Sequence, residues 1–270
     1  MDLKTLKEFE VEIQKHVPDF SIKFKNQTAS QKLIGFLTQS FNSKYMTSYA
    51  TTSFPTVYFP TKVFYESQPD SSFKILAHEF IHMMDMKNHP TWWKLMYALP
   101  QALAIFPLIA FAALSGPHSW IVGILLGSYL LGCVAGLISK ILFWIVTVTG
   151  VVASLILAVW LTHWIAAALF GVLFFIAPWP SPWRTNREIR GYTMNMAYYQ
   201  WLQGNVPELA KLSAVSQFVT SNYYFMSWNR VEVYGNLTLA VTAAANGVLA
   251  KEEPYSIVRQ FLADRNLLKG

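Results

Sequence analysis

Two histidines and a glutamate within five consecutive residues carry the clearest chemical signal of this sequence. The segment His78-Glu79-Phe80-Ile81-His82 has the HExxH pattern. On a helix this spacing lets both imidazoles reach one tetrahedral Zn²⁺, while Glu79 points at the fourth position and can take a proton from water there. We therefore expect His78 and His82 to bind one zinc ion per chain and Glu79 to act as general base and then general acid.

A catalytic zinc ion needs a third protein ligand. Between Asp85 and Glu188 the sequence contains no Asp or Glu. Asp85 lies three residues beyond His82 and is better placed to orient an imidazole N–H than to bind the metal. Glu188, which follows Arg187, is the predicted third ligand; the alternative is that Glu188 only pairs with neighbouring arginines at a membrane surface.

Peptide hydrolysis at such a site also needs a donor for the developing oxyanion. Tyr192 is a candidate because it lies one helical turn after Glu188. Tyr223 and Arg230 are two further candidates. Aromatic packing is the alternative role for both tyrosines.

The HExxH segment is predicted to lie on a helix. Asp70 and Ser71 supply N-cap candidates after Pro69, and Pro90 ends the helix. The apolar side chains fall on one stripe, and the two histidines and Asp85 fall on the opposite side. The stripe comprises Phe73, Leu76, Phe80, Met83 and Met84.

The remaining polar parts of the chain predict a mainly α protein with a small β element. Residues 1–20 have the pattern of an amphipathic helix. Residues 44–65 are rich in Tyr, Thr, Val and Phe and predict short strands, with 56–59 an edge strand because prolines bracket it. After Arg184 the sequence predicts helices near 187–203, 206–220, 229–249 and 254–268.

The middle of the chain has the composition of a membrane region. Only 13% of the 270 residues are charged, against roughly 25% in an average soluble domain. From Leu95 to Trp183, Lys140 is the only charged residue. The apolar part, 98–178, is about four times the length needed to cross a bilayer. Four spans are expected, near 98–115, 119–138, 141–161 and 164–178; two spans with long or re-entrant pieces are the alternative.

The basic residues that flank these spans predict the orientation. With four spans they all fall on one side, which the positive-inside rule assigns to the cytoplasm together with both termini and the catalytic part. These residues are Lys87, Lys94, Lys140, Arg184, Arg187 and Arg190. The predicted organisation is an N-terminal part of the catalytic domain (1–94), a transmembrane region (95–180) and a C-terminal helical part with the third ligand (181–270).

The composition argues against a nucleic-acid partner and against an intramolecular disulfide. The net charge of +6 is scattered rather than gathered in runs, which argues against a nucleic-acid partner. Cys133 is the single cysteine, so no intramolecular disulfide forms, and we expect it to pack among helices. The sequence does not indicate an oligomeric state.

The order of these features resembles the membrane gluzincins, typified by the HtpX-like heat-shock proteases and the CAAX prenyl proteases. The resemblance covers roughly residues 45–200. The family's second motif carries an arginine and a glutamate zinc ligand followed by Ala-Asp; this chain keeps Arg187 and Glu188 but has Gly191 and Tyr192 at the last two positions. Without the family's Asp, Asp85 is expected to compensate.

The resemblance also implies how substrate is bound. In the family, an edge strand ahead of the active helix binds extended substrate backbone. By similarity this strand comprises Thr56, Val57, Tyr58 and Phe59. The family's usual two spans between the motifs differ from the four expected here, which marks this chain as a divergent relative.

The sequence thus predicts a zinc-dependent, membrane-embedded endopeptidase, a zincin-like metalloprotease with a multi-span helical bundle inserted between its two ligand helices. Its partners are a peptide or membrane-protein substrate and the lipid bilayer. The alternative is a non-enzymatic membrane scaffold or pore with a structural or vestigial metal site. The large apolar share of the chain favours the alternative, whereas Glu79, which a structural zinc site does not require, favours the enzyme.

Overall fold

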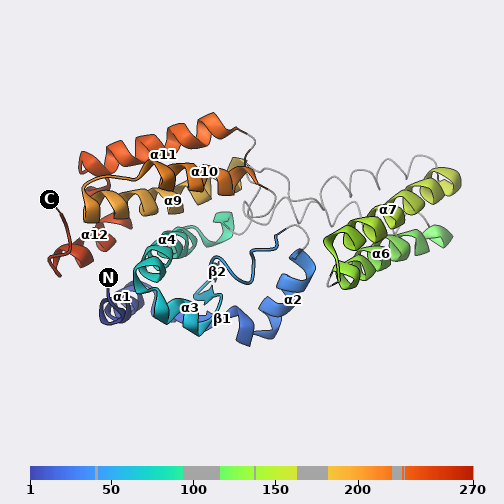
Figure 1. Ribbon diagram of the computed structural model, residues 1–270, viewed down its shortest axis with the longest axis horizontal. Helices are drawn as coiled ribbons and strands as arrows, with labels where there is room; N and C mark the ends of the chain where they lie inside the picture. The colour runs from blue at the N-terminus through green and yellow to red at the C-terminus, as the bar shows by residue number, and fades with distance from the viewer. Residues whose placement is uncertain are drawn as a thin grey trace.

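The protein is mainly helical with a small three-stranded sheet, as the sequence predicts. A computed structural model describes residues 1–39, 42–93, 116–136, 138–162, 182–220, 227 and 229–269. An α/β part contains both termini, and a helical hairpin formed by α6 and α7 extends away from it (Figure 1). Both termini lie at the end of the α/β part that is remote from the hairpin (Figure 1).

The α/β part is built around α4 (Pro69–Asn88), which carries the HExxH segment. Pro69 occupies its first turn, where the missing N–H costs no hydrogen bond. The helix α1 (Leu3–His16) covers one side of α4 with buried Leu6, Phe9 and Ile13. The rings of Phe9 and Phe73 lie 4.4 Å apart. Each large apolar side chain buried in this way stabilises the fold by about 1.5–3 kcal/mol.

The sheet contains β1 (Ser21–Phe24), β2 (Thr51–Ser53) and β3 (Thr56–Phe59) in the order β1-β3-β2. Strand β3 pairs in parallel with β1 and antiparallel with β2, so it lies in the centre. The prediction that Thr56–Phe59 is an edge strand is therefore wrong. The prolines that suggested an edge lie just outside β3, and its own four residues keep their backbone N–H groups for pairing.

The segment after β3 also differs from the prediction. Instead of a further strand, the chain forms the short helix α3 (Lys62–Ser67), which begins where the Thr61 side chain accepts a hydrogen bond from the backbone N–H of Phe64. A short 3₁₀ turn (Lys25–Gln27) and α2 (Ala29–Thr38) connect β1 to the rest of the sheet. Strand β1 and helix α2 were not predicted.

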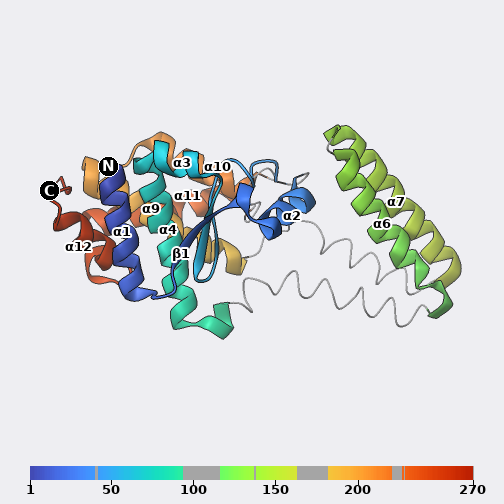
Figure 2. The same ribbon diagram turned by 90° about the horizontal axis from the view of Figure 1, so that it is seen from below.

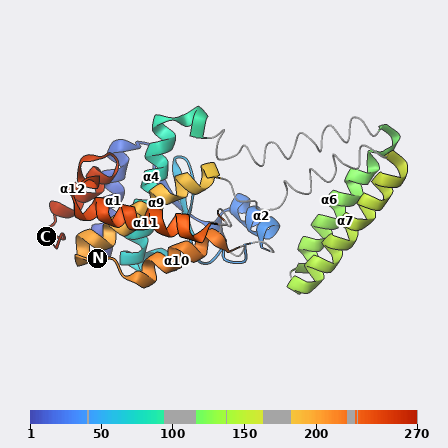
Figure 3. The same ribbon diagram turned by 90° about the horizontal axis from the view of Figure 1, so that it is seen from above.

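The first of the C-terminal helices packs on another side of α4, and two further helices pack on the first. Their order is α9 (Pro182–Gln203), α10 (Glu208–Val219), α11 (Arg230–Ala245) and α12 (Tyr255–Ala263), which confirms the four predicted helices with shorter ends for the last three. Figures 2 and 3 show α9 running beside α4. Because α1 and α9 pack on α4 from different sides, the histidine-bearing side of α4 is buried as well as its apolar stripe.

Two helices in the described ranges are long and apolar enough to cross a membrane, at Gly116–Ala135 and Ile141–Leu161. They correspond to α6 (Trp120–Gly136) and α7 (Lys140–Thr162), and to the second and third predicted spans. The first and fourth predicted spans, 98–115 and 164–178, lie outside the described residues. The two helices leave large apolar side chains exposed, as lipid-facing helices do. Examples are Leu131, Ile141, Ile156 and Trp160.

The hairpin meets the α/β part where its two helices join. The hydroxyl of Tyr129 donates a hydrogen bond to the carbonyl of Leu37 at 2.5 Å, and the side-chain amide of Gln39 donates to the carbonyl of Cys133 at 3.0 Å. The turn between α6 and α7 therefore lies on the side of α2 (Figure 1). Cys133 itself is buried between helices, as expected.

Candidate metal centre

Three potential ligands from α4 and α9 meet at one buried point. The Nε2 atoms of His78 and His82 lie 3.1 Å apart. The Oε2 atom of Glu188 lies 3.5 Å from the first and 3.6 Å from the second. The three side chains are almost fully buried, with 6%, 4% and 4% of their surface exposed.

These distances suit a metal ion. Three ligand atoms of a tetrahedral zinc ion with bonds of 2.0–2.1 Å lie about 3.3 Å from one another. Two imidazoles and one carboxylate are also a ligand set of catalytic zinc sites, which leave a fourth position open. The residues present therefore fit the metal that the sequence predicts, and the structure brings together the three residues predicted to bind it.

The electrostatics of the cluster favour a positive charge between the three side chains. Burial by itself would raise the pKa of Glu188, but the facing His82 and His78 hold that pKa far below its ordinary value. Burial would likewise lower the pKa of His82, but the carboxylate of Glu188 keeps it raised. A proton or a metal cation bound between these side chains would be stabilised by the same negative charge of Glu188.

Gly191 allows α9 to approach the first histidine. A Cβ atom at this position would lie 2.4 Å from Nε2 of His78 and within 2.7 Å of two further atoms of the same ring. Any side chain there would displace the imidazole or the helix. The packing of α9 against His78 therefore requires glycine at this position.

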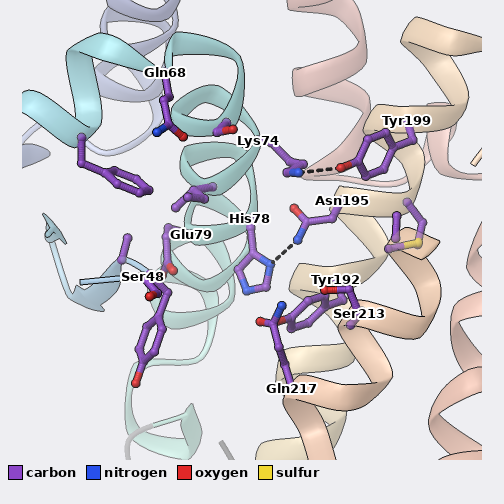
Figure 4. A pocket seen from close by; sticks show the side chains of 18 residues that line it. Ser48, Gln68, Lys74, His78, Glu79, Tyr192, Asn195, Tyr199, Ser213 and Gln217 are labelled. Carbon is purple, nitrogen blue, oxygen red and sulfur yellow. Dashed lines mark hydrogen bonds between the residues drawn. The ribbon is translucent and has the colours of Figure 1, made fainter. Parts of the chain in front are cut away.

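Asn195 is a site residue that the sequence analysis missed. Its side-chain amide lies 3.3 Å from Nδ1 of His78 (Figure 4). The amide atom at this distance is Nδ2, and Oδ1 is buried with no hydrogen-bond partner in the described part of the chain. When Nε2 of a histidine binds a metal, Nδ1 carries the proton, and a 180° turn of the Asn195 amide would bring Oδ1 to accept it. The available signal was its position seven residues after Glu188, two turns along the same face of α9.

Asp85 does not orient a histidine, contrary to the prediction. Its carboxylate accepts hydrogen bonds from Nε and NH2 of Arg190 at 2.9 and 3.0 Å, and NH1 of Arg187 lies 3.5 Å away. Nδ1 of His82 is buried and has no hydrogen-bond partner in the described part of the chain. Asp85 therefore joins α4 to the arginines that flank Glu188, and so fixes the ligand helix rather than an imidazole.

Glu79 lies beside the ligands and opens onto a cleft. The hydroxyl of Thr52 on strand β2 donates a hydrogen bond of 2.6 Å to Oε2 of Glu79. The cleft has a volume of ≈ 370 Å³ and is lined by Glu79, His78, the segment 48–50 and one face each of α4, α9 and α10. This is the arrangement that a general base needs, because its carboxylate is held in place and is reachable by substrate.

The three candidate oxyanion donors are placed differently. Tyr192 is next to the metal centre, with its ring 5.0 Å from the ring of His78, but its hydroxyl donates to the side chain of Gln217. Arg230 is exposed at the start of α11 and lines a second cavity that shares no lining residue with the cleft. Tyr223 lies outside the described residues.

A buried lysine supports the cleft wall. The ammonium of Lys25 donates hydrogen bonds to the carbonyls of Tyr45 and Tyr49 at 2.7 and 3.0 Å and lies 3.9 and 4.7 Å from the centres of their rings. Burial lowers the pKa of Lys25 to about 7, and the charge of Glu79 opposes this shift. Since Tyr49 lines the cleft, Lys25 fixes the segment that leads into β2.

Comparisons with family models, curated proteins and solved structures found no match. The resemblance to the membrane gluzincins therefore stays a prediction from the sequence.

Proposed function

We propose that this protein is a zinc-dependent peptidase of a membrane. One observation carries the proposal: His78, His82 and Glu188 converge in a buried cluster although the whole apolar region separates Glu188 from the histidines. Glu79, which a purely structural zinc site would not need, borders the same cluster and opens onto a cleft.

In the proposed mechanism, His78, His82 and Glu188 hold the zinc ion. A bound zinc ion polarises the scissile carbonyl and lowers the pKa of the attacking water. Glu79, fixed by Thr52, removes a proton from this water and then gives it to the leaving amine. Asn195 holds the ring of His78, and Asp85 holds α9 through Arg190.

Strand β2 is the proposed binding edge for substrate backbone. Among the described residues it pairs with β3 alone, along one side, and Thr52 within it contacts Glu79. An extended peptide that pairs with the free edge of β2 would therefore pass the general base. This replaces the assignment of that role to Thr56–Phe59, whose two edges are both occupied.

The position of the hairpin is evidence that the proposed site lies at the membrane surface. The C-terminal part of α6 contacts the end of α2 through Tyr129 and Cys133, so this end of the two candidate spans faces the α/β part. Lys140 is the first residue of α7 and lies at the same end. By the positive-inside rule the α/β part then lies in the cytoplasm.

Metal analysis combined with a cleavage assay tests the proposal. Wild type and Glu79→Gln are purified in detergent, their zinc content is measured, and each is incubated with casein and with a membrane-protein substrate. We expect equal zinc and loss of cleavage in Glu79→Gln, because Glu79 acts on water and does not bind the metal. A zinc-loaded wild type that cleaves no protein, or an active Glu79→Gln variant, would favour the scaffold or pore.

A further inference from the structure

The cleft beside the metal centre contains a cation without a carboxylate partner. Lys74 lies on α4 one turn before His78, and its ammonium donates a hydrogen bond of 2.6 Å to the hydroxyl of Tyr199 on α9. The same ammonium lies 4.7 Å from the centre of the Tyr199 ring. No carboxylate oxygen of the described residues lies within ion-pair distance of Lys74, and the side chain is half-buried.

The rest of the cleft is neutral apart from the catalytic groups. Its lining residues from α4, α9 and α10 recur at spacings of three and four, so each helix contributes one continuous face. Among the lining residues in the described chain, Lys74, His78 and Glu79 are the ones that can carry a charge near neutral pH. Polar lining groups without charge include Ser48, Gln68, Ser71, Asn195, Ser213 and Gln217.

We infer that Lys74 binds a carboxylate of the substrate about two residues from the bond that is cleaved. This inference rests on the proposed peptidase function and names the substrate's chemistry. The position of the subsite follows from helix geometry, since four residues of α4 correspond to about 6 Å along its axis. An extended peptide advances about 3.3–3.6 Å per residue, so two residues cover that distance.

The local environment makes a carboxylate the best ligand. Tyr199 orients the ammonium through a neutral hydroxyl and leaves its positive charge uncompensated (Figure 4). A bound carboxylate would form a charge-assisted hydrogen bond in a partly desolvated cleft, where such bonds are stronger than on an open surface. The carboxylate has two sources, an Asp or Glu side chain within the substrate or a free C-terminus, and they require different substrates.

Matched peptides distinguish these sources. The set has Glu or Gln at each position near the cleaved bond, and each peptide ends in a free acid or an amide. Cleavage sites are read by mass spectrometry with the zinc-loaded protein. Binding is measured separately by fluorescence anisotropy with the Glu79→Gln variant, which needs no turnover.

The variants are Lys74→Gln, Lys74→Glu and Lys74→Arg. Lys62→Gln is the control, since Lys62 is an exposed lysine of α3 that pairs with Glu66. Wild type and Lys62→Gln should favour a carboxylate at one fixed distance from the cut by roughly 10- to 100-fold. Lys74→Arg should keep this preference, Lys74→Gln should lose it, and Lys74→Glu should favour Lys or Arg there.

The outcomes separate this inference from the proposed function. Cleavage without any carboxylate preference, or a preference that survives in Lys74→Gln, overturns the inference and leaves the peptidase intact. Binding that depends on a carboxylate and on Lys74, without cleavage by wild type, supports the subsite and contradicts the peptidase. Neither binding nor cleavage of any peptide by the zinc-loaded protein contradicts both.

Discussion

The carboxylate of Asp85 on α4 accepts two hydrogen bonds from the guanidinium of Arg190 on α9. Asp85 lies three residues after His82, and Arg190 lies two residues after Glu188. The pair therefore fixes the relative position of the two helices that supply the predicted metal ligands. Its geometry is that of a two-point arginine–carboxylate pair, which constrains orientation as well as distance.

Glu188 and Asp85 should respond differently to removal. Glu188→Ala deletes one of three ligands, so zinc content and activity should fall together. Asp85→Ala leaves all three ligands but removes the contact that holds α9 on α4, and it should cost roughly 10- to 100-fold in zinc affinity, the loss typical of outer contacts around a metal. The measurement is a zinc titration against a competing chelator. Full zinc and activity in Glu188→Ala, with loss of both in Asp85→Ala, would contradict the assignment.

Glu252→Ala is the matched control for Asp85→Ala. Glu252 also lies 3.5 Å from Arg190, but it is exposed, whereas Asp85 is buried. An exposed ion pair contributes roughly 0–1 kcal/mol, so this variant should bind zinc as wild type does. An equal loss of zinc affinity in Asp85→Ala and Glu252→Ala would mean that zinc binding depends on the overall charge around Arg190 and not on the buried pair.

Gly191→Ala should impair zinc binding, because the added Cβ would collide with the ring of His78. The expected result is a lower thermal midpoint and at least a tenfold weaker zinc affinity, of the size seen when ligand orientation is lost. Gly235→Ala on α11 is the control. Apart from the adjacent residues and the backbone of α11 itself, no described atom lies within 4 Å of the corresponding Cβ there, and alanine favours a helix by about 1 kcal/mol over glycine. Equal zinc affinity in both variants would show that the close approach is not needed.

Lys25 should make the folded protein more stable as the pH rises above neutral. Burial lowers its pKa to about 7 in the folded protein, whereas in the unfolded chain it stays near 10.5. Between these values the unfolded state binds the extra proton, so stability rises with pH by up to about 1.4 kcal/mol per unit. Below pH 7 Lys25 is protonated in both the folded and the unfolded state, so it no longer makes the stability depend on pH.

The test compares thermal midpoints of wild type and Lys25→Met between pH 6 and 9. The difference, wild type minus variant, should be constant below pH 7 and increase above it. Ionisable groups remote from Lys25 are the same in both proteins and cancel in this difference. Lys62→Met serves as an exposed control and should show no such slope. A difference that does not change with pH would contradict a buried, neutral Lys25.

The turn between α6 and α7 should lie on the cytoplasmic side. In a Cys133→Ser background, a cysteine at position 140 should resist an impermeant reagent applied to intact cells, and one at position 117 should react. The physical reason is the contact of the adjoining end of α6 with the α/β part, together with the positive charge of Lys140. Labelling at position 140 from outside would place the α/β part outside the cytoplasm.

The convergence of His78, His82 and Glu188 could largely be predicted from the sequence, whereas the contacts that support these residues could not. The HExxH spacing is local to one helix, and the absence of other acids between Asp85 and Glu188 left few rivals for the third ligand. The partner of Asp85 and the role of Asn195 depend on how α9 packs along α4, and no local pattern encodes that register. The prediction that β3 is an edge strand was wrong for a similar reason, because the pairing of β3 with Ser21–Phe24 joins segments far apart in the sequence.

The apolar region lies between the two halves of the metal centre in the chain, and this position imposes an order on biosynthesis. A ribosome releases His78 and His82 first, then residues 83–187, and only afterwards Glu188. A nascent chain that has not passed the apolar region therefore holds two ligands and lacks the third. The proposed peptidase therefore has an incomplete set of metal ligands until the ribosome has synthesised the whole apolar region.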